Sequence, residues 1–420
     1  MRRRRGYPGP ARGEPAPALF VHPRPRQPLV VALGVLAPLL LVLGIWLGGH
    51  PDRLPGPVRD ALVGDSDART VDRALDEVHG EYYRQLPRGA LVDAALSGIV
   101  RSLHDRFSSY FTAREYRDFQ ESTDAQFSGV GLTAREDPRG LLVDEVFDHS
   151  PAQRAGIRSG DVIVAVNGRS LRGKSGNASR DLIKGRPGTR VRLTILSHGR
   201  RRTRTVQRAT VSVPVVASHL GRLADGRTYA DVALAQFSSG AHGELRQAID
   251  RRLKQGAKGL VLDLRGNGGG LVEEARLVAS IFIPEGPIVS TRGRAQPART
   301  LMAAGGAIAK DIPVVVLVDG ETASAAEIVT GALQDRHRAA VVGRHTFGKG
   351  VFQEVTTLPN GGALDLTVGQ YFTPNGRNLG GGGVRRGSGI KPDVVAVDNP
   401  HTPRYDEALA VAKRVLARRR

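Results

Sequence analysis

The chain contains 420 residues, enough to bury more than one hydrophobic core, and it contains no cysteine. Disulfide bonds, a thiol nucleophile and a cysteine-zinc site are therefore excluded. The formal net charge is +20, but residues 1–28 hold seven arginines against one glutamate, and the remaining excess is dispersed along the chain. Because no nucleic-acid-binding motif accompanies this excess, we expect a solvated basic surface and no nucleic-acid partner.

A basic, proline-rich tail at 1–28 precedes an uncharged apolar run at 29–47. At about 1.5 Å per helical residue, this run spans about 28 Å, close to the hydrocarbon thickness of a bilayer. Trp46 lies near its far end, where interfacial aromatic residues are typical, and the arginines before the run favour a cytoplasmic N-terminus. A cleaved signal peptide is the alternative. Because the run is long and no clear Ala-x-Ala follows it, we predict a single-pass signal anchor at 29–47.

Two further segments precede the first recognisable module. Residues 48–64 are rich in glycine and proline, which predicts a linker. Apolar residues recur at helical spacing over 65–120, among them Leu75, Leu91 and Leu103, which predicts an N-terminal helical region. A helical cap or an oligomer contact accounts for this region, and it needs no catalytic role.

Residues 121–210 contain motifs that together resemble a PDZ domain. They are Phe127-Ser-Gly-Val-Gly-Leu132, Ser150-Pro-Ala-Gln-Arg-Ala-Gly-Ile157, Gly160-Asp-Val-Ile163, Val166-Asn-Gly168 and Lys184-Gly-Arg-Pro-Gly-Thr189. The glycines of the first motif leave backbone N–H groups free to converge on a carboxylate, and the adjoining strand edge can pair with an extended peptide. A plain glycine turn between strands is the alternative. The resemblance implies ligands with free, apolar C-termini and places their carboxylate-binding loop at Ser128, Gly129, Val130 and Gly131.

From about residue 211 to 398 the pattern changes to strands alternating with helices, which predicts an α/β core. The predicted strands are 229–237, 259–264, 313–318, 340–342, 351–358 and 364–370, and the predicted helices are 243–255 and 325–333. Residues 399–420 are predicted to form a basic helical tail with a solvated end.

Ser324, Lys349 and Gln353 are the candidate catalytic side chains of this core. A serine nucleophile needs a base, and a lysine held neutral by burial can take its proton. Gln353 follows the lysine by four residues and can hydrogen-bond and orient the amine. Each residue also has an ordinary role. Ser324-Ala-Ala-Glu327 fits a helix capping box, the lysine fits a surface position, and the glutamine fits a polar strand position.

The glycine-rich run Asp263-Leu-Arg-Gly-Asn-Gly-Gly-Gly270 lacks the spacing and the following Lys-Ser/Thr of a P-loop. We interpret it as a tight turn whose N–H groups face an oxyanion. A histidine-based triad that uses His337 or His345 stays an alternative, because proximity in sequence does not decide geometry. No His-Glu-x-x-His is present, so we expect no metal and no other cofactor.

In this order, the motifs resemble the carboxyl-terminal processing peptidases, also called tail-specific proteases. The resemblance covers about residues 70–398 and includes Asp105-Arg-Phe-Ser-Ser-Tyr110. It implies a mixed α/β chain with a PDZ-like β-rich module and an α/β protease core. It implies that Ser324 is the nucleophile, Lys349 the general base and Gln353 the residue that supports the base. It also implies that the backbone N–H groups of Gly269 and Ala325 stabilise the oxyanion. The family usually has Asn-Pro-Gly-Gly where this chain has Asn267-Gly-Gly-Gly270.

We therefore expect a membrane-anchored serine endopeptidase that recognises the tails of protein substrates through its PDZ domain. The resemblance, the anchor and the basic N-terminus indicate the outer face of a bacterial plasma membrane, and a homo-oligomer or an adaptor is a further partner to consider. Two alternatives stay open: a membrane-tethered peptide-binding scaffold with an inactive protease domain, and a hydrolase of cell-wall peptides.

Overall fold

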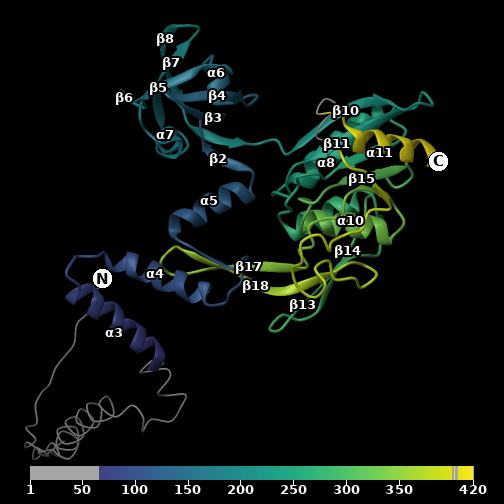
Figure 1. Ribbon diagram of the computed structural model, residues 1–420. Helices are drawn as coiled ribbons and strands as arrows, with labels where there is room; N and C mark the ends of the chain where they lie inside the picture. Colours follow the sequence, from purple (N-terminus) through teal and green to yellow (C-terminus); the bar gives the residue numbers. More distant parts are fainter. Residues whose placement is uncertain (1–65, 400–401, 403–404, 420) are drawn as a thin grey trace, which may run out of the picture. The chain divides into compact units, whose positions relative to one another are not determined.

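The computed structural model describes residues 66–399, 402 and 405–419 (Figure 1). Its internal contacts divide the chain into two compact units that meet between Ala94 and Ala95. The predicted anchor at 29–47 lies outside the described residues. Within the described ranges, every helix is too short or too polar to cross a bilayer.

The N-terminal unit contains helix α3 and the first half of helix α4, and an ion pair links them. The Arg88 guanidinium contacts the Asp72 and Asp76 carboxylates at 2.5 Å and 2.9 Å. Helix α5 follows in the second unit. The predicted helical character of 65–120 is confirmed, except that a short strand, β1, interrupts it; the bounds are α3 (Ser66–Glu81), α4 (Arg88–Arg101), β1 (Ser109–Phe111) and α5 (Ala113–Thr123).

The PDZ-like module is an antiparallel sheet in the order β3-β4-β5-β7-β8, with β6 paired to β5 and a separate β2–β9 pair. Val191, Leu193 and Ile195 alternate along one strand of the sheet, and all three side chains are buried. Its elements are β2 (Gln126–Gly129), β3 (Leu132–Asp137), β4 (Gly140–Val146), α6 (Pro151–Arg154), β5 (Val162–Val166), β6 (Arg169–Ser170), α7 (Gly176–Ile183), β7 (Arg190–Ser197), β8 (Arg200–Gln207) and β9 (Ala209–Ser212).

The core is built on a six-stranded sheet in the order β10-β11-β12-β15-β16-β19, parallel from β11 onward. Its short apolar strands are buried on both faces, as continuous valine and leucine runs predict. Its elements are β10 (Val216–Arg222), β11 (Thr228–Leu234), α8 (Ala241–Lys254), β12 (Leu260–Asp263), α9 (Val272–Ser280), β15 (Val314–Val318), α10 (Ala325–Asp335), β16 (Ala340–Gly343), β19 (Val394–Val395) and α11 (Glu407–Arg418).

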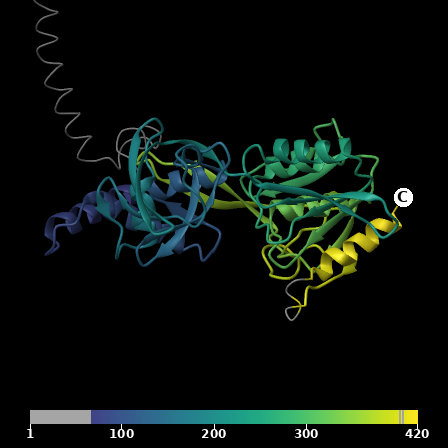
Figure 2. The same cartoon turned by 90° about the horizontal axis from the view of Figure 1, so that it is seen from above.

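This sheet is the middle of three layers. One face packs on α8, α9 and α10 in a cluster that includes Leu262, Val316 and Val329. The other face packs on α11 through Ala412 and Leu416, so that α11 lies on the opposite side of the sheet (Figure 2). The C-terminal helix was predicted as a basic tail with a solvated end. The helix is present, and the structure adds that one face of α11 is part of the core, because its small and apolar residues recur at helical spacing.

A second sheet contains the segment that follows Gly348-Lys349-Gly350. Strand β18 pairs with β1, β13 and β17, and β14 continues from β13. The bounds are β13 (Pro287–Gly293), β14 (Arg299–Met302), β17 (Val351–Thr357) and β18 (Ala363–Phe372). The β1–β18 pairing matters for the site, because it brings the residues just before β1 to the same part of the core as Lys349.

Candidate active site

Ser324 lies where the loop after β15 enters α10. Its backbone has φ 57° and ψ −119°, and only 8% of its surface is exposed. A positive φ is uncommon for a residue with a Cβ and costs on the order of 1–3 kcal/mol. The fold keeps this strain at the first turn of a helix, where free N–H groups and the positive end of the helix dipole meet an anion.

Glu327 ties the serine helix to the lysine turn. Its fully buried carboxylate accepts hydrogen bonds from the Ser324 N–H at 2.9 Å, the Thr346 hydroxyl at 2.5 Å, the Gly348 N–H at 2.8 Å and the Lys349 N–H at 2.9 Å. Of the predicted capping box, the hydrogen bond from the Ser324 N–H to the Glu327 carboxylate is therefore formed. Burial raises the pKa of Glu327 above its ordinary value, although these hydrogen bonds favour the ionised form.

Lys349 has a half-buried amine with one direct acceptor. Nζ donates to Oε1 of Gln353 at 2.7 Å and lies 4.8 Å from the centre of the Phe107 ring. Burial lowers the pKa of Lys349, while the negative charges of Asp365, Asp105 and Glu327 oppose that change. The balance favours a larger neutral fraction than an exposed lysine would have, which a general base requires.

Tyr371 connects the serine and the lysine turn. It is fully buried, its hydroxyl donates to the backbone oxygen of Lys349, and the Ser324 side chain acts on its pKa as a hydrogen-bond partner. Burial raises the pKa of Tyr371 well above its ordinary value, so the hydroxyl stays protonated. No hydrogen bond joins Ser324 Oγ to Lys349 Nζ directly in the described part of the chain. Tyr371 thus links the Ser324 side chain to the backbone of Lys349, while the lysine amine points toward Gln353.

The glycine-rich run after β12 lies against Ser324. A Cβ on Gly269, whose φ is +105°, would meet Ser324 Cβ at 2.8 Å and the Ala325 nitrogen at 3.0 Å. The Ala325 N–H belongs to the first turn of α10, where no acceptor exists within the helix. The Gly269 N–H, however, donates to Oδ1 of Asn267 at 2.8 Å. To stabilise an oxyanion, Gly269 would have to exchange that acceptor.

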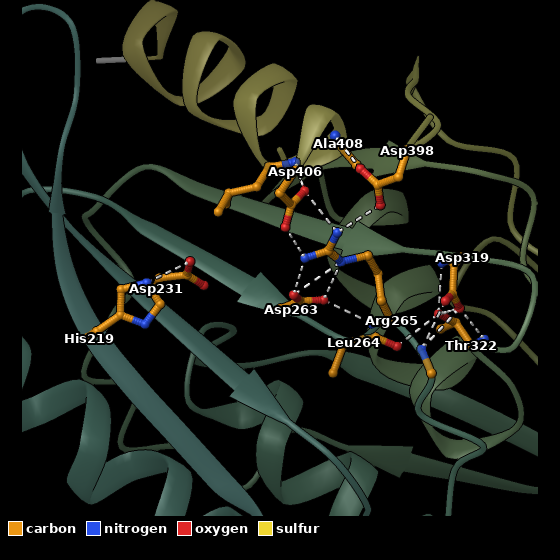
Figure 3. A network of polar contacts seen from close by, with 12 residues as sticks. His219, Asp231, Asp263, Leu264, Arg265, Asp319, Thr322, Asp398, Asp406 and Ala408 are labelled. Carbon is orange, nitrogen blue, oxygen red and sulfur yellow. Dashed lines mark hydrogen bonds and ion pairs between the residues drawn. The ribbon is translucent and has the colours of Figure 1, made fainter. Parts of the chain in front are cut away.

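Further contacts lock the glycine run to the serine loop. The Gly266 N–H donates to both Asp319 carboxylate oxygens at 3.1 Å, and the Thr322 hydroxyl donates to the Leu264 oxygen at 2.8 Å (Figure 3). Sequence reasoning assigned no role to Asp319 or Thr322. The signal for them was weak, because an aspartate and a threonine before a helix also fit an ordinary turn.

Arg265 anchors the glycine run to the C-terminal helix. Its guanidinium contacts the Asp263 carboxylate at 2.7 Å and the Asp406 carboxylate at 2.8 Å, and Figure 3 shows it between these two side chains. Asp406 also caps α11 by accepting from the Leu409 N–H. These carboxylates raise the pKa of Arg265 despite its burial, so the charge is permanent. Sequence reasoning missed Asp406, because nothing near it in the chain points to Arg265.

The predicted carboxylate loop covers Ser128 and Gly129, which end β2, and Val130 and Gly131, which join β2 to β3. Val130 is buried, Gly131 has φ +82°, and the Ser128 hydroxyl donates to the Gly185 oxygen at 2.5 Å. A hollow of ≈ 560 Å³ opens beside the loop. Its apolar lining includes Phe127, Val130, Leu132, Leu141 and Ile183.

Three other kinds of site were considered from the sequence: a histidine-based triad, a metal site and a phosphate-binding loop. Both His337 and His345 are exposed, and among the described contacts neither side chain reaches Ser324. The described residues contain no cluster of histidine and carboxylate side chains that could hold a metal ion. The glycine run packs against the serine rather than around an open phosphate site.

Comparisons with known proteins agree with this architecture. Peptidase family S41 matches residues 228–396, and the PDZ domain matches residues 142–197. The carboxy-terminal processing protease CtpA of Bacillus subtilis (strain 168) is 33% identical over 339 residues, which cover 80% of this chain and 71% of that protein. The chain belongs to peptidase family S41. It is a serine-type carboxy-terminal processing protease with a PDZ domain, as the sequence resemblance implied.

Two further known proteins are similar to this chain. A protein of Staphylococcus aureus (strain COL), named "Probable CtpA-like serine protease", is 32% identical over 338 residues, 80% of this chain and 66% of that protein. Among solved structures, a photosystem II D1 C-terminal processing protease is 30% identical, covers 83% of this chain and 94% of its own, and has a TM-score of 0.46.

Proposed function

We propose that this S41 peptidase cleaves peptide bonds with Ser324 as nucleophile and Lys349 as general base. The observation that carries the proposal is the environment of the lysine. Its amine has a pKa lowered by burial and an oriented acceptor in Gln353, and its backbone shares the Glu327 carboxylate with Ser324. A lysine on a surface would remain protonated at neutral pH and could not accept a proton.

The reaction follows ordinary acyl transfer. Neutral Lys349 takes the Ser324 proton while the hydroxyl oxygen attacks the peptide carbonyl, and the negative charge develops on the carbonyl oxygen. The Ala325 N–H at the helix start and the Gly269 N–H, released from Asn267, then stabilise that charge. The lysine returns its proton to the leaving amine, and water releases the acyl-enzyme. Before the first step, the amine, which donates an N–H to Gln353, must turn its lone pair toward Ser324.

The PDZ domain supplies substrate selection in this proposal. The loop Ser128–Gly131 would bind a terminal carboxylate through backbone N–H groups, and the tail would extend along the edge of β3. The apolar lining of the adjacent hollow supports a preference for apolar tail residues. The signal anchor at 29–47 would hold the protease at the outer face of a bacterial plasma membrane.

The test uses the full-length protein in detergent and two unfolded model proteins that differ only in their tails. One ends in Leu-Ala-Ala and the other in Asp-Asp-Glu. We expect cleavage of the first, and we expect Ser324→Ala and Lys349→Ala each to reduce kcat at least about 100-fold, because each removes a reacting group. Lys310→Ala, at an exposed lysine, is the matched control.

Full activity in Lys349→Ala would refute the proposed base. Equal cleavage of both substrates would refute tail selection without touching the dyad. A protein that binds the apolar tail and cleaves nothing would favour the inactive scaffold. Cleavage of cell-wall peptides in place of either protein would favour the third hypothesis.

A further inference from the structure

The segment Asp105–Ser108 forms one wall of the lysine site, although it lies far from Lys349 in sequence. The Phe107 ring faces the lysine amine at 4.8 Å. The Ser108 hydroxyl accepts from the Thr367 N–H at 3.0 Å, between residues 259 positions apart. The same hydroxyl donates to the Asp105 carboxylate at 2.7 Å. The segment is therefore fastened to β18, directly beside the lysine.

A chain of side-chain hydrogen bonds runs from the amine to this segment. Lys349 Nζ donates to Gln353 Oε1 at 2.7 Å, and Gln353 Nε2 donates to the Thr367 hydroxyl at 3.0 Å. Because Thr367 accepts from the glutamine, its own hydroxyl proton is free to be donated elsewhere. The Thr367 side chain lowers the pKa of the Asp105 carboxylate as a hydrogen-bond donor does, and the Thr367 N–H reaches the same carboxylate through the Ser108 hydroxyl.

Asp105 decides which group donates and which accepts in each of these side-chain hydrogen bonds. Partial burial by itself raises the pKa of Asp105, but hydrogen bonds from Thr367, Phe107 and Ser108 and the charge of Lys349 hold it below its ordinary value. Asp105 is therefore ionised at neutral pH and can only accept. An acceptor at this end obliges Thr367 to donate toward it and to accept from Gln353.

The direction matters because a glutamine amide can turn over. With Oε1 toward Lys349, a neutral amine donates one N–H to the oxygen and keeps its lone pair. With Nε2 toward Lys349, the amide would donate to that lone pair and occupy the site that must receive the Ser324 proton. The orientation of Gln353 thus decides whether the lysine can act as a base.

We propose that Asp105 and Thr367 are positioning residues that hold the Gln353 amide with its oxygen toward Lys349 and so keep the lysine lone pair available. The inference rests on the proposed function, and it extends the site to a segment to which the sequence analysis assigned no catalytic role. The alternative is that the chain of hydrogen bonds merely fastens the Asp105 segment to β18.

The test compares Thr367→Val, Asp105→Asn and Thr367→Ser in the full-length protein, with cleavage of the Leu-Ala-Ala model protein followed across pH. Thr367→Val keeps the shape and removes the hydroxyl, and Thr367→Ser restores it. We expect kcat to fall about 10- to 100-fold in the first two variants, with KM within about twofold and recovery in Thr367→Ser. Thr357→Val, an exposed threonine on β17, is the matched control and should resemble wild type.

The pH profile separates positioning from fastening. An acceptor facing the amine favours its protonated form, so loss of the Gln353 orientation lowers the lysine pKa and moves the acid limb of kcat/KM to lower pH. Asp105→Asn moves the limb in the same direction, since it also removes a negative charge. The other charged groups that act on the amine, Asp365 and Glu327, are unchanged in all variants.

A lower plateau with an unmoved acid limb would overturn the proposal, because a damaged structure reduces only the active fraction. Wild-type rates in Thr367→Val and Asp105→Asn would also overturn it. The roles of Ser324 as nucleophile and Lys349 as base are tested separately, by the activities of Ser324→Ala and Lys349→Ala. A second measurement needs no substrate: the chain has eight lysines, so carbon-13 NMR titration can follow Lys349, whose pKa should fall in both variants and stay unchanged in Thr357→Val.

Discussion

Replacing Glu327 with glutamine should destabilise the core and disconnect Ser324 from the lysine turn. One carboxylate oxygen accepts from Thr346 and Gly348, and the other accepts from the backbone N–H groups of Ser324 and Lys349. In Glu327→Gln an NH₂ group must take the place of one oxygen. If the NH₂ group replaces the oxygen that accepts from Ser324 and Lys349, the backbone N–H groups of these two residues face a donor and lose their acceptor.

The expected cost follows from these two lost acceptors. Each buried, unsatisfied N–H costs about 1–3 kcal/mol, which gives about 2–6 kcal/mol in total. Part of this is offset, because burial raises the pKa of Glu327 and a neutral amide removes the cost of the buried charge. We therefore expect a net loss of about 2–4 kcal/mol, a large share of the stability of a typical domain.

Guanidinium chloride unfolding of the core transition measures this change, and the rate of fluorophosphonate labelling of Ser324 reports on the site. Glu321→Gln is the matched control, since its carboxylate is 63% exposed and pairs with the exposed Arg386. Exposed pairs contribute about 0–1 kcal/mol. A loss below about 1 kcal/mol in Glu327→Gln, with labelling unchanged, would refute the view that this carboxylate joins the two loops.

Three further outcomes are expected. Burial raises the pKa of Asp365 to about 6, and its carboxylate charge favours the protonated form of Lys349. Asp365→Asn should therefore move the acid limb of the kcat/KM profile to lower pH and leave the plateau unchanged. An acid limb at the wild-type pH would contradict this. Gly269→Ala should reduce kcat at least about 100-fold, because a Cβ would lie 2.8 Å from Ser324 Cβ, whereas Gly268→Ala, which meets nothing within 4 Å, should stay near wild type in the same assay. Asp406→Ala should lower the unfolding free energy by about 1 kcal/mol by removing an acceptor of the Arg265 guanidinium, and a thermal melt equal to wild type would argue against that anchor.

Much of the core was predictable because its signals are local. Apolar runs of strand length marked β12, β15 and β16, and helical spacing marked α8 and α10. The motifs around Ser324 and Lys349 indicated a serine hydrolase. The first motif precedes a helix and the second precedes a strand. Each motif has a specific composition within a short stretch, so neighbouring residues alone carry the information.

The sequence by itself therefore determined the alternating core, the PDZ-like module and the candidate nucleophile and base. The tertiary structure alone decided that Glu327 joins their loops, that α11 covers one face of the sheet, and that the Gly269 N–H is held by Asn267. It also brought Asp105 and Thr367 together beside the lysine. Contacts of this kind depend on how distant strands pair and which face each helix buries, and no spacing along the chain records the distance between two residues that a fold brings together.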